Sequence, residues 1–118
     1  MKYMCLIYVD EARHAALPAG ERRRLEHEAV AYDAKLRASG RYLASDALAS
    51  ARTATTLRHA GGRFSTHDGP YAETKEQLGG FVMIEASDLD EALKLATGFP
   101  GARFGGVEVR PVLQVGGA

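Results

Sequence analysis

The sequence predicts one α+β domain, because strand-like and helix-like segments alternate along a chain of single-domain length. Residues 2–9 and 80–86 are apolar runs of strand length, and residues 21–39 carry apolar side chains at helical spacing. No linker or low-complexity tract interrupts the 118 residues. We therefore expect residues 1–118 to form a single domain with one hydrophobic core.

The first predicted strand, Lys2–Val9, is rich in aromatic and branched side chains and is apolar on both faces, as in a strand that is covered on both sides. Cys5 is the only cysteine of the chain, so we expect it to be a small buried hydrophobe without a disulfide partner. A loop that contains Pro18 should lead into an amphipathic helix over residues 21–39, which Gly40 closes.

A hairpin is predicted in the middle of the chain. Residues 53–58 and 63–67 are rich in strand-forming residues, and they flank a glycine-containing turn at residues 59–62. The alanine- and serine-rich segment 44–52 has no clear period, so we expect it to be irregular.

A second strand–helix unit follows the hairpin. Residues 80–86 form its strand, and Ser87 and Asp90 have the spacing of a helix capping pair, with Asp in place of the usual Glu. The helix that starts there should end at Gly98 and Pro100.

The last predicted strand covers residues 107–115. Pro111 cannot donate a hydrogen bond to a neighbouring strand, which indicates an edge strand or a strand end, and residues 116–118 should be frayed. The order strand, helix, hairpin, strand, helix, strand favours a ferredoxin-like α+β sandwich.

Two helices can cover only one face of such a sheet, although residues 4–9 and 81–84 are apolar on both faces. An exposed apolar sheet would aggregate, and symmetric dimers are the commonest oligomers. We therefore expect a homodimer packed sheet to sheet, that is, a dimeric α+β barrel. The alternative is that the hairpin, residues 44–52 or the C-terminal tail covers the second face.

The composition excludes several classes of partner. The 15 basic and 15 acidic residues balance, so we expect no direct binding to nucleic acid. No apolar run is long enough to span a membrane and no secretion signal is recognisable, so we expect no membrane partner and a cytoplasmic location. Four scattered histidines and one cysteine predict no metal site, and no phosphate-binding loop or other cofactor motif is present.

The run DGPYAETKEQLGGF at residues 68–81 resembles the signature of the YCII-related proteins of the DGPF type. The opening residues 2–8, the later LDEA at 89–92 and the closing VEVRP at 107–111 also resemble that family, so the likeness spans nearly the whole chain. Tyr71 stands where the family name has phenylalanine.

This resemblance implies a dimeric α+β barrel of the ferredoxin-like kind. The wider superfamily is associated with an active site that uses a His and Asp pair, and a few relatives act on small aromatic or lactone compounds. Many DGPF-type members occur beside extracytoplasmic-function sigma factors, which implies a sigma factor as a candidate partner. His14 and His27 are the histidines nearest the first helix, and neither lies in a diagnostic motif.

Asp68 is the first candidate for a catalytic residue. At a strand end before Gly-Pro, its carboxylate could act as a general base or orient a histidine. The alternative is that Asp68 only caps the turn by accepting hydrogen bonds from the amides of residues 69–72. His14 is the second catalytic candidate, since it lies in a loop near Asp10 and Glu11 and could join a pocket at the end of the first strand.

The candidate binding residues follow Asp68. Gly69 and Pro70 fix the shape of the loop, and Tyr71 could stack on a flat ligand or lie at a dimer seam. Glu73 and Lys75 could form a desolvated ion pair, as could Asp68 and Lys75, although such runs are more often solvated turns.

Three functions fit these observations. The leading hypothesis is a small dimeric protein that binds a small organic molecule in a pocket beside the DGPY loop. The alternatives are a regulatory module linked to an extracytoplasmic-function sigma factor, and a small lyase, isomerase or hydrolase that uses an Asp–His or Asp–Lys pair.

Overall fold

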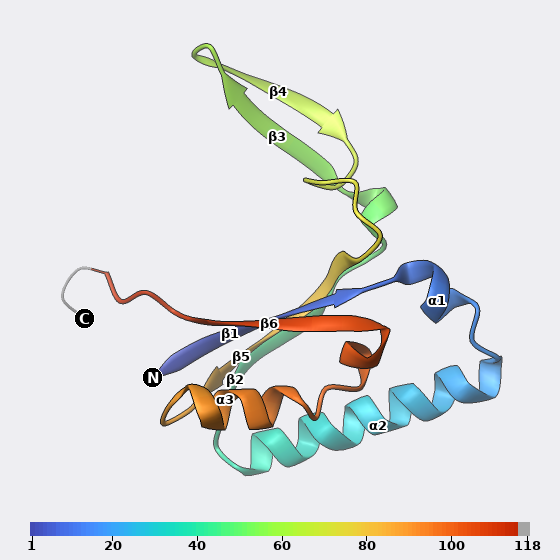
Figure 1. Ribbon diagram of the computed structural model, residues 1–118, viewed down its shortest axis with the longest axis vertical. Helices are drawn as coiled ribbons and strands as arrows, with labels where there is room; N and C mark the ends of the chain where they lie inside the picture. Colours follow the sequence, from blue (N-terminus) through green and yellow to red (C-terminus); the bar gives the residue numbers. More distant parts are fainter. Residues whose placement is uncertain (116–118) are drawn as a thin grey trace.

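The computed structural model describes residues 1–115, which form a four-stranded antiparallel sheet with helices on one side and a separate β-hairpin (Figure 1). The strand order in the sheet is β2-β5-β1-β6. The elements are β1 (Lys2–Val9), α1 (Glu11–Ala15), α2 (Ala19–Ala38), β2 (Tyr42–Ala47), the 3₁₀ helix η1 (Ala51–Thr53), β3 (Thr55–Ala60), β4 (Arg63–Asp68), β5 (Gln77–Glu85), α3 (Leu89–Ala96), the 3₁₀ helix η2 (Pro100–Phe104) and β6 (Gly105–Pro111).

The predicted α+β class is confirmed, and most predicted elements lie where the sequence pattern places them. The helix predicted over residues 21–39 is α2, which begins two residues earlier, after Pro18. Gly40 closes it with a φ of 79°, and its amide donates to the carbonyl of Arg37. The last strand was predicted over residues 107–115, but β6 covers Gly105–Pro111, so it begins two residues earlier and ends four residues earlier. Within residues 1–115 it pairs only with β1, so Pro111 marks both a strand end and an edge strand, as predicted. The predicted fraying of residues 116–118 lies outside the described residues.

Three details of the prediction are wrong. Residues 44–52 were expected to be irregular, but most of the first half belongs to β2, an edge strand that pairs with β5. The stretch before α2 was expected to be a loop and contains the short helix α1, which the Asp10 side chain caps. The cap of α3 is Asp88 and not Ser87.

The core lies between the sheet and the two long helices. Tyr3 and Cys5 on β1 pair with Ile84 and Val82 on β5, and these four side chains are buried against Leu36, Ala92, Ala96 and Phe99. Burial raises the pKa of the Cys5 thiol to about 11. The prediction that Cys5 is a small buried residue is therefore confirmed.

The other face of the sheet has no helix over it. Both α2 and α3 lie on one side of the strands (Figure 1). On the opposite side, Met4 pairs with Met83 and Leu6 pairs with Phe81, and these four side chains are half-buried. We call this surface the open face. Its cover by a second copy of the chain stays a prediction.

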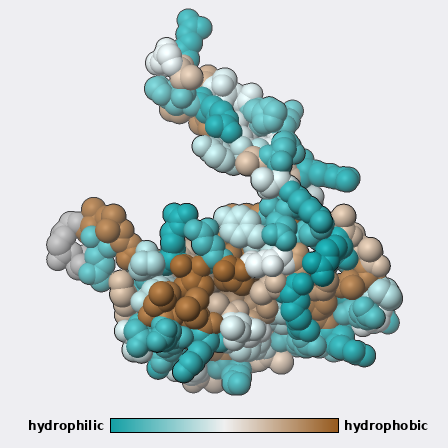
Figure 2. Space-filling model, viewed as in Figure 1, coloured by the Kyte–Doolittle hydropathy of each residue, from teal (hydrophilic) through white to brown (hydrophobic). Residues whose placement is uncertain are grey.

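Strands β3 and β4 form a two-stranded sheet of their own, which we call the arm (residues 55–68). Its turn is Gly61-Gly62, and both glycines have positive φ, at 59° and 76°. A two-residue turn with this conformation matches the twist of the flanking strands. The arm projects from the side of the sheet opposite the helices and stands clear of the body (Figures 1 and 2).

None of the helices in the described part of the chain combines the length and the apolar character needed to cross a membrane.

Candidate functional site

The segment from residue 68 to residue 76, which we call the DGPY loop, connects the arm to β5, and Gly69 fixes its first turn. Gly69 has a φ of 134°, a backbone conformation that residues with a Cβ rarely adopt. A Cβ at this position would lie 3.2 Å from Glu73 Oε1 and 3.3 Å from His67 Nε2. The Gly69 amide donates to the Ala54 carbonyl at 2.8 Å, and its carbonyl accepts from Thr56 Oγ1 at 2.8 Å. The loop therefore needs glycine here for conformation and for space.

Arg58 and Gln77 hold the rest of the loop. The Arg58 guanidinium lies 4.4 Å from the centre of the Tyr71 ring and donates to the Tyr71 carbonyl at 2.8 Å. The Gln77 amide group donates to the carbonyls of Ala72 and Thr74, at 2.8 and 2.9 Å. The loop thus has contacts to the arm on one side and to the start of β5 on the other.

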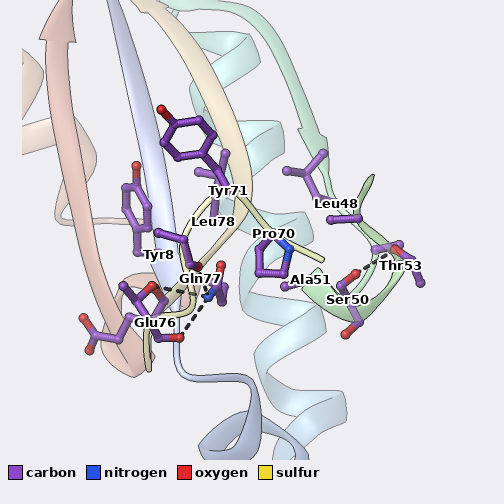
Figure 3. Close-up of a pocket in the computed structure, with 14 residues that line it drawn as sticks. Tyr8, Leu48, Ser50, Ala51, Thr53, Pro70, Tyr71, Glu76, Gln77 and Leu78 are labelled. Carbon is purple, nitrogen blue, oxygen red and sulfur yellow. Dashed lines mark hydrogen bonds between the residues drawn. The ribbon is translucent and has the colours of Figure 1, made fainter. Parts of the chain in front are cut away.

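A pocket of about 530 Å³ lies beside the DGPY loop, and we call it the loop pocket. Its walls come from the end of β1, the segment after β2, the DGPY loop and the start of β5. In Figure 3, Pro70 lies between Gln77 and Ala51, with Tyr71 above it and Leu48 across from it. The lining residues are Tyr8, Leu48, Ala49, Ser50, Ala51, Thr53, Ala54, Pro70, Tyr71, Ala72, Thr74, Glu76, Gln77 and Leu78.

A second, more open cavity of about 590 Å³ lies on the other side of the same loop. Four carboxylate residues line it, so we call it the carboxylate cavity. Its charged residues are Asp10, Glu11, Arg52, Asp68, Glu73 and Lys75. Ala51, Pro70, Thr74 and Gln77 line both cavities. The DGPY loop is therefore a partition between an apolar pocket and an acidic one.

The predicted binding residues divide between these two cavities. Tyr71 lines only the loop pocket, and Pro70 lines both. Gly69, Glu73 and Lys75 line the carboxylate cavity together with Asp68. The sequence prediction placed all of them around one site, whereas the structure places them around two.

Asp68 lies at the exposed end of β4. Among residues 1–115, its carboxylate has no hydrogen-bond or ion-pair partner, so the alternative of a turn cap for amides 69–72 has no hydrogen bond to support it. Lys75 pairs with Asp10 at 3.9 Å, and not with Asp68 or Glu73. The Lys75 side chain is 83% exposed, so this ion pair contributes little to stability.

His14 does not share a cavity with Asp68. It lies on α1, where its ring packs edge-on against Phe104 with centroids 5.6 Å apart. It lines a third cavity of about 320 Å³ with Leu48 and Leu78, and Asp68 is not among the lining residues. The structure therefore does not bring the two predicted catalytic residues together in one pocket. His27 is exposed on α2 and lines none of these cavities.

Two groups of site residues were not predicted from the sequence. One is the wall formed by residues 48–54, which belongs to a segment without a periodic pattern. The other is Asp10, whose buried carboxylate accepts hydrogen bonds from the amides of Ala12 and Arg13 and faces Lys75. The sequence feature that could have indicated Asp10 is its position directly after the first strand.

No three His, Cys, Asp or Glu side chains within residues 1–115 lie close enough together to hold a metal ion. The acidic residues of the carboxylate cavity therefore do not form a ready cation site.

Comparison with known proteins gives one family and one fold. The family model of the YCII-related domain matches residues 1–115. An uncharacterised protein of Rhizobium meliloti (strain 1021) is 39% identical over 114 residues, which is 95% of this chain and 92% of that protein. The structure is similar to that of 5-chloro-2-hydroxyhydroquinone dehydrochlorinase (TftG) from Burkholderia phenoliruptrix AC1100 in complex with 2,5-dihydroxybenzoquinone. The TM-score is 0.50 at 18% identity, with 96% of this chain and 94% of that chain covered. The last comparison concerns the fold alone, whereas the first two show that the chain belongs to the YCII-related domain family.

Proposed function

We propose that the protein binds a small, flat, largely apolar organic molecule in the loop pocket. The observation that carries this proposal is the pocket itself. Its volume of about 530 Å³ is within the range of small-molecule sites, and alanine, leucine, proline and tyrosine side chains make up most of its walls. The carboxylate cavity is more open and more charged, and it suits a small neutral or apolar molecule less well.

The polar groups of the loop pocket indicate how such a molecule would be oriented. Most of them are already engaged: Thr53 Oγ1 donates to the Ser50 carbonyl, and Thr74 Oγ1 donates to the Glu76 carbonyl. The hydroxyls of Tyr8 and Tyr71 have no hydrogen-bond partner within residues 1–115. They are therefore the hydroxyls most available to a hydroxyl or carbonyl of a ligand.

The loop pocket opens onto the open face of the sheet, which links binding to assembly. Tyr8 pairs with Leu78 across β1 and β5, and both side chains are on the same side of the sheet as Leu6 and Met83. The strand order fits a ferredoxin-like sandwich. In the dimeric α+β barrel that we propose, a second sheet packs on this face and narrows the mouth of the pocket.

The similar fold of the dehydrochlorinase suggests the first probe. That enzyme was solved with 2,5-dihydroxybenzoquinone, a small flat ring with polar substituents. Such a flat ring matches the lining of the loop pocket, where apolar walls surround the free hydroxyls of Tyr8 and Tyr71. We therefore choose it, with benzoquinone and 2,5-dihydroxybenzoate, as the probe set.

Ala51→Leu is the first variant. Ala51 lines both the loop pocket and the carboxylate cavity, and leucine would fill part of either volume. Ala54→Leu distinguishes the two cavities, because Ala54 lines the loop pocket and not the carboxylate cavity, and it should weaken binding as Ala51→Leu does. Ala34→Leu on the exposed surface of α2 is the matched control, because it adds the same atoms far from the pocket. Isothermal titration of the wild type should give saturable binding of at least one probe. Ala51→Leu should weaken that binding about tenfold or more, which corresponds to about 1.4 kcal/mol.

Ala34→Leu should bind as the wild type does. Equal affinity of the wild type and Ala51→Leu would place the ligand outside the loop pocket. A wild type that binds none of the three probes would contradict the proposed ligand class.

A further inference from the structure

The arm has two chemically different faces. Residues that pair across its two strands point to the same side, so the register assigns each side chain to a face. One face carries Leu57, His59 and Phe64, together with Thr55, Thr66 and Asp68. The other face carries Thr56, Arg58, Ala60, Arg63, Ser65 and His67. We call the first the apolar face of the arm, since this alternation is typical of a sheet with one side covered.

Nothing within the described residues 1–115 covers the apolar face. Leu57 is 59% exposed and Phe64 is 68% exposed. The Phe64 ring lies edge-on to the ring of its cross-strand neighbour His59, with centroids 4.7 Å apart. An isolated two-stranded hairpin is marginally stable in water. The arm therefore lacks, within one chain, the packing that a hairpin of this kind needs.

The contacts at the base of the arm turn its apolar face away from its own chain. Thr56 and Arg58 belong to the polar face, and they bind the DGPY loop through the Gly69 carbonyl and the Tyr71 carbonyl. Leu57 lies between them in sequence and so points to the opposite side. No other segment among residues 1–115 therefore lies on the apolar face.

The exposed area is too large for a compact monomer. The chain exposes 8207 Å² and has a mass of 12.7 kDa. A compact monomer of this mass exposes about 6,200 Å². The radius of gyration is 16.3 Å, whereas a compact domain of this length has about 13.5 Å. The excess of roughly 2,000 Å² is comparable to what one chain buries in an obligate dimer.

We propose that the arm packs its apolar face against a second copy of this chain. This contact presupposes the pairing of two chains proposed above and adds a specific element to it. The arm and the open face lie on the same side of the molecule, opposite the helices (Figure 1). In a two-fold assembly each copy offers the same two surfaces, so one symmetry operation covers both arms and both open faces. Leu57 and Phe64 are the anchor side chains of this contact.

The test compares two double variants of the full chain. Leu57→Ser with Phe64→Ser makes the apolar face polar, and both side chains lie outside the core of the body. Ala60→Ser with Arg63→Ser is the matched control on the exposed polar face. Sedimentation equilibrium of the wild type should give the mass of two chains. The first variant should raise the Kd of the dimer about tenfold or more, as expected for the loss of two buried anchors. The control should change the Kd by less than about twofold.

Hydrogen exchange of the wild type gives a second readout that does not depend on a variant folding. Arm amides should be protected above the Kd and should exchange faster below it. A dimer whose Kd is the same in the wild type and in the Leu57→Ser, Phe64→Ser variant would overturn the arm contact and leave the pairing of sheets intact. A monomeric wild type would overturn both the arm contact and the pairing of sheets. This holds whether hydrogen exchange shows the arm amides to be protected or exposed in the monomer.

Discussion

At the scale of single residues, Gly69 decides the shape of the DGPY loop. Its positive φ and the nearness of His67 and Glu73 are two separate reasons for glycine. The sequence indicated the first reason, because Asp-Gly-Pro is a turn signal. It could not indicate the second, since the positions of the His67 ring and the Glu73 carboxylate depend on how the arm meets β5.

Gly69→Ala should lower the free energy of unfolding by about 1–3 kcal/mol, because alanine is strained at this φ and its Cβ crowds two side chains. Gly20→Ala is the control: Gly20 lies in the first turn of α2 and has no neighbour within 4 Å of an added Cβ. That change should be neutral or stabilising by up to about 1 kcal/mol. Urea unfolding at one protein concentration measures both. A Gly69→Ala protein as stable as the wild type would show that the loop adopts another conformation.

At the scale of elements, the start of α3 contains two possible helix-capping pairs that are offset by one residue. Ser87 and Asp90 have capping spacing, and so do Asp88 and Glu91 one residue later. In the structure Asp88 Oδ1 accepts from the Glu91 amide at 2.9 Å, and Glu91 Oε1 accepts from the Ser87 amide at 2.8 Å. Glu91 also pairs with Arg41, which is a contact between distant parts of the chain that no local pattern contains.

Asp88→Ala should therefore cost about 1 kcal/mol of stability, which is typical for the loss of a helix cap. Ser87→Ala removes a neighbouring hydroxyl that does not cap the helix and should change stability by less than about 0.5 kcal/mol. Thermal unfolding followed by circular dichroism compares the two variants. A larger loss of stability in Ser87→Ala than in Asp88→Ala would show that Ser87 caps the helix.

The elements that the sequence predicted well are those with a strong local pattern. Lys2–Val9 has a long apolar run, residues 21–39 have helical spacing, and the arm has a glycine turn between strand-forming segments. Strand β2 was missed because alanine and serine carry little pattern, and its pairing with β5 is a contact between segments distant in the sequence. The same limit hid the wall of the loop pocket at residues 48–54, although the DGPY loop across from it was recognised.

At the scale of the whole molecule, the one-sided sheet is the feature that most needs a partner. The helices cover Cys5 and Val82, whereas Leu6 and Met83 lie on the open face. The sequence predicted this imbalance by counting helices against apolar strand faces. It did not indicate that the arm stands on the same side, because the direction of the arm depends on the path of residues 48–54 and of the DGPY loop.

Met83→Glu tests the open face separately from the arm. Met83 lies in the middle of β5, next to Met4 on one side and Ala44 on the other. A carboxylate at the centre of a sheet-to-sheet interface would be buried without a partner, which costs several kcal/mol. We expect Met83→Glu to be monomeric at micromolar concentration by light scattering. Val30→Glu is the matched control, since Val30 is 70% exposed on α2, on the helix side of the sheet, and it should remain a dimer. If Met83→Glu stays dimeric with an unchanged Kd, the two chains do not meet through the open face, and the loop pocket is open to solvent rather than closed by a second sheet.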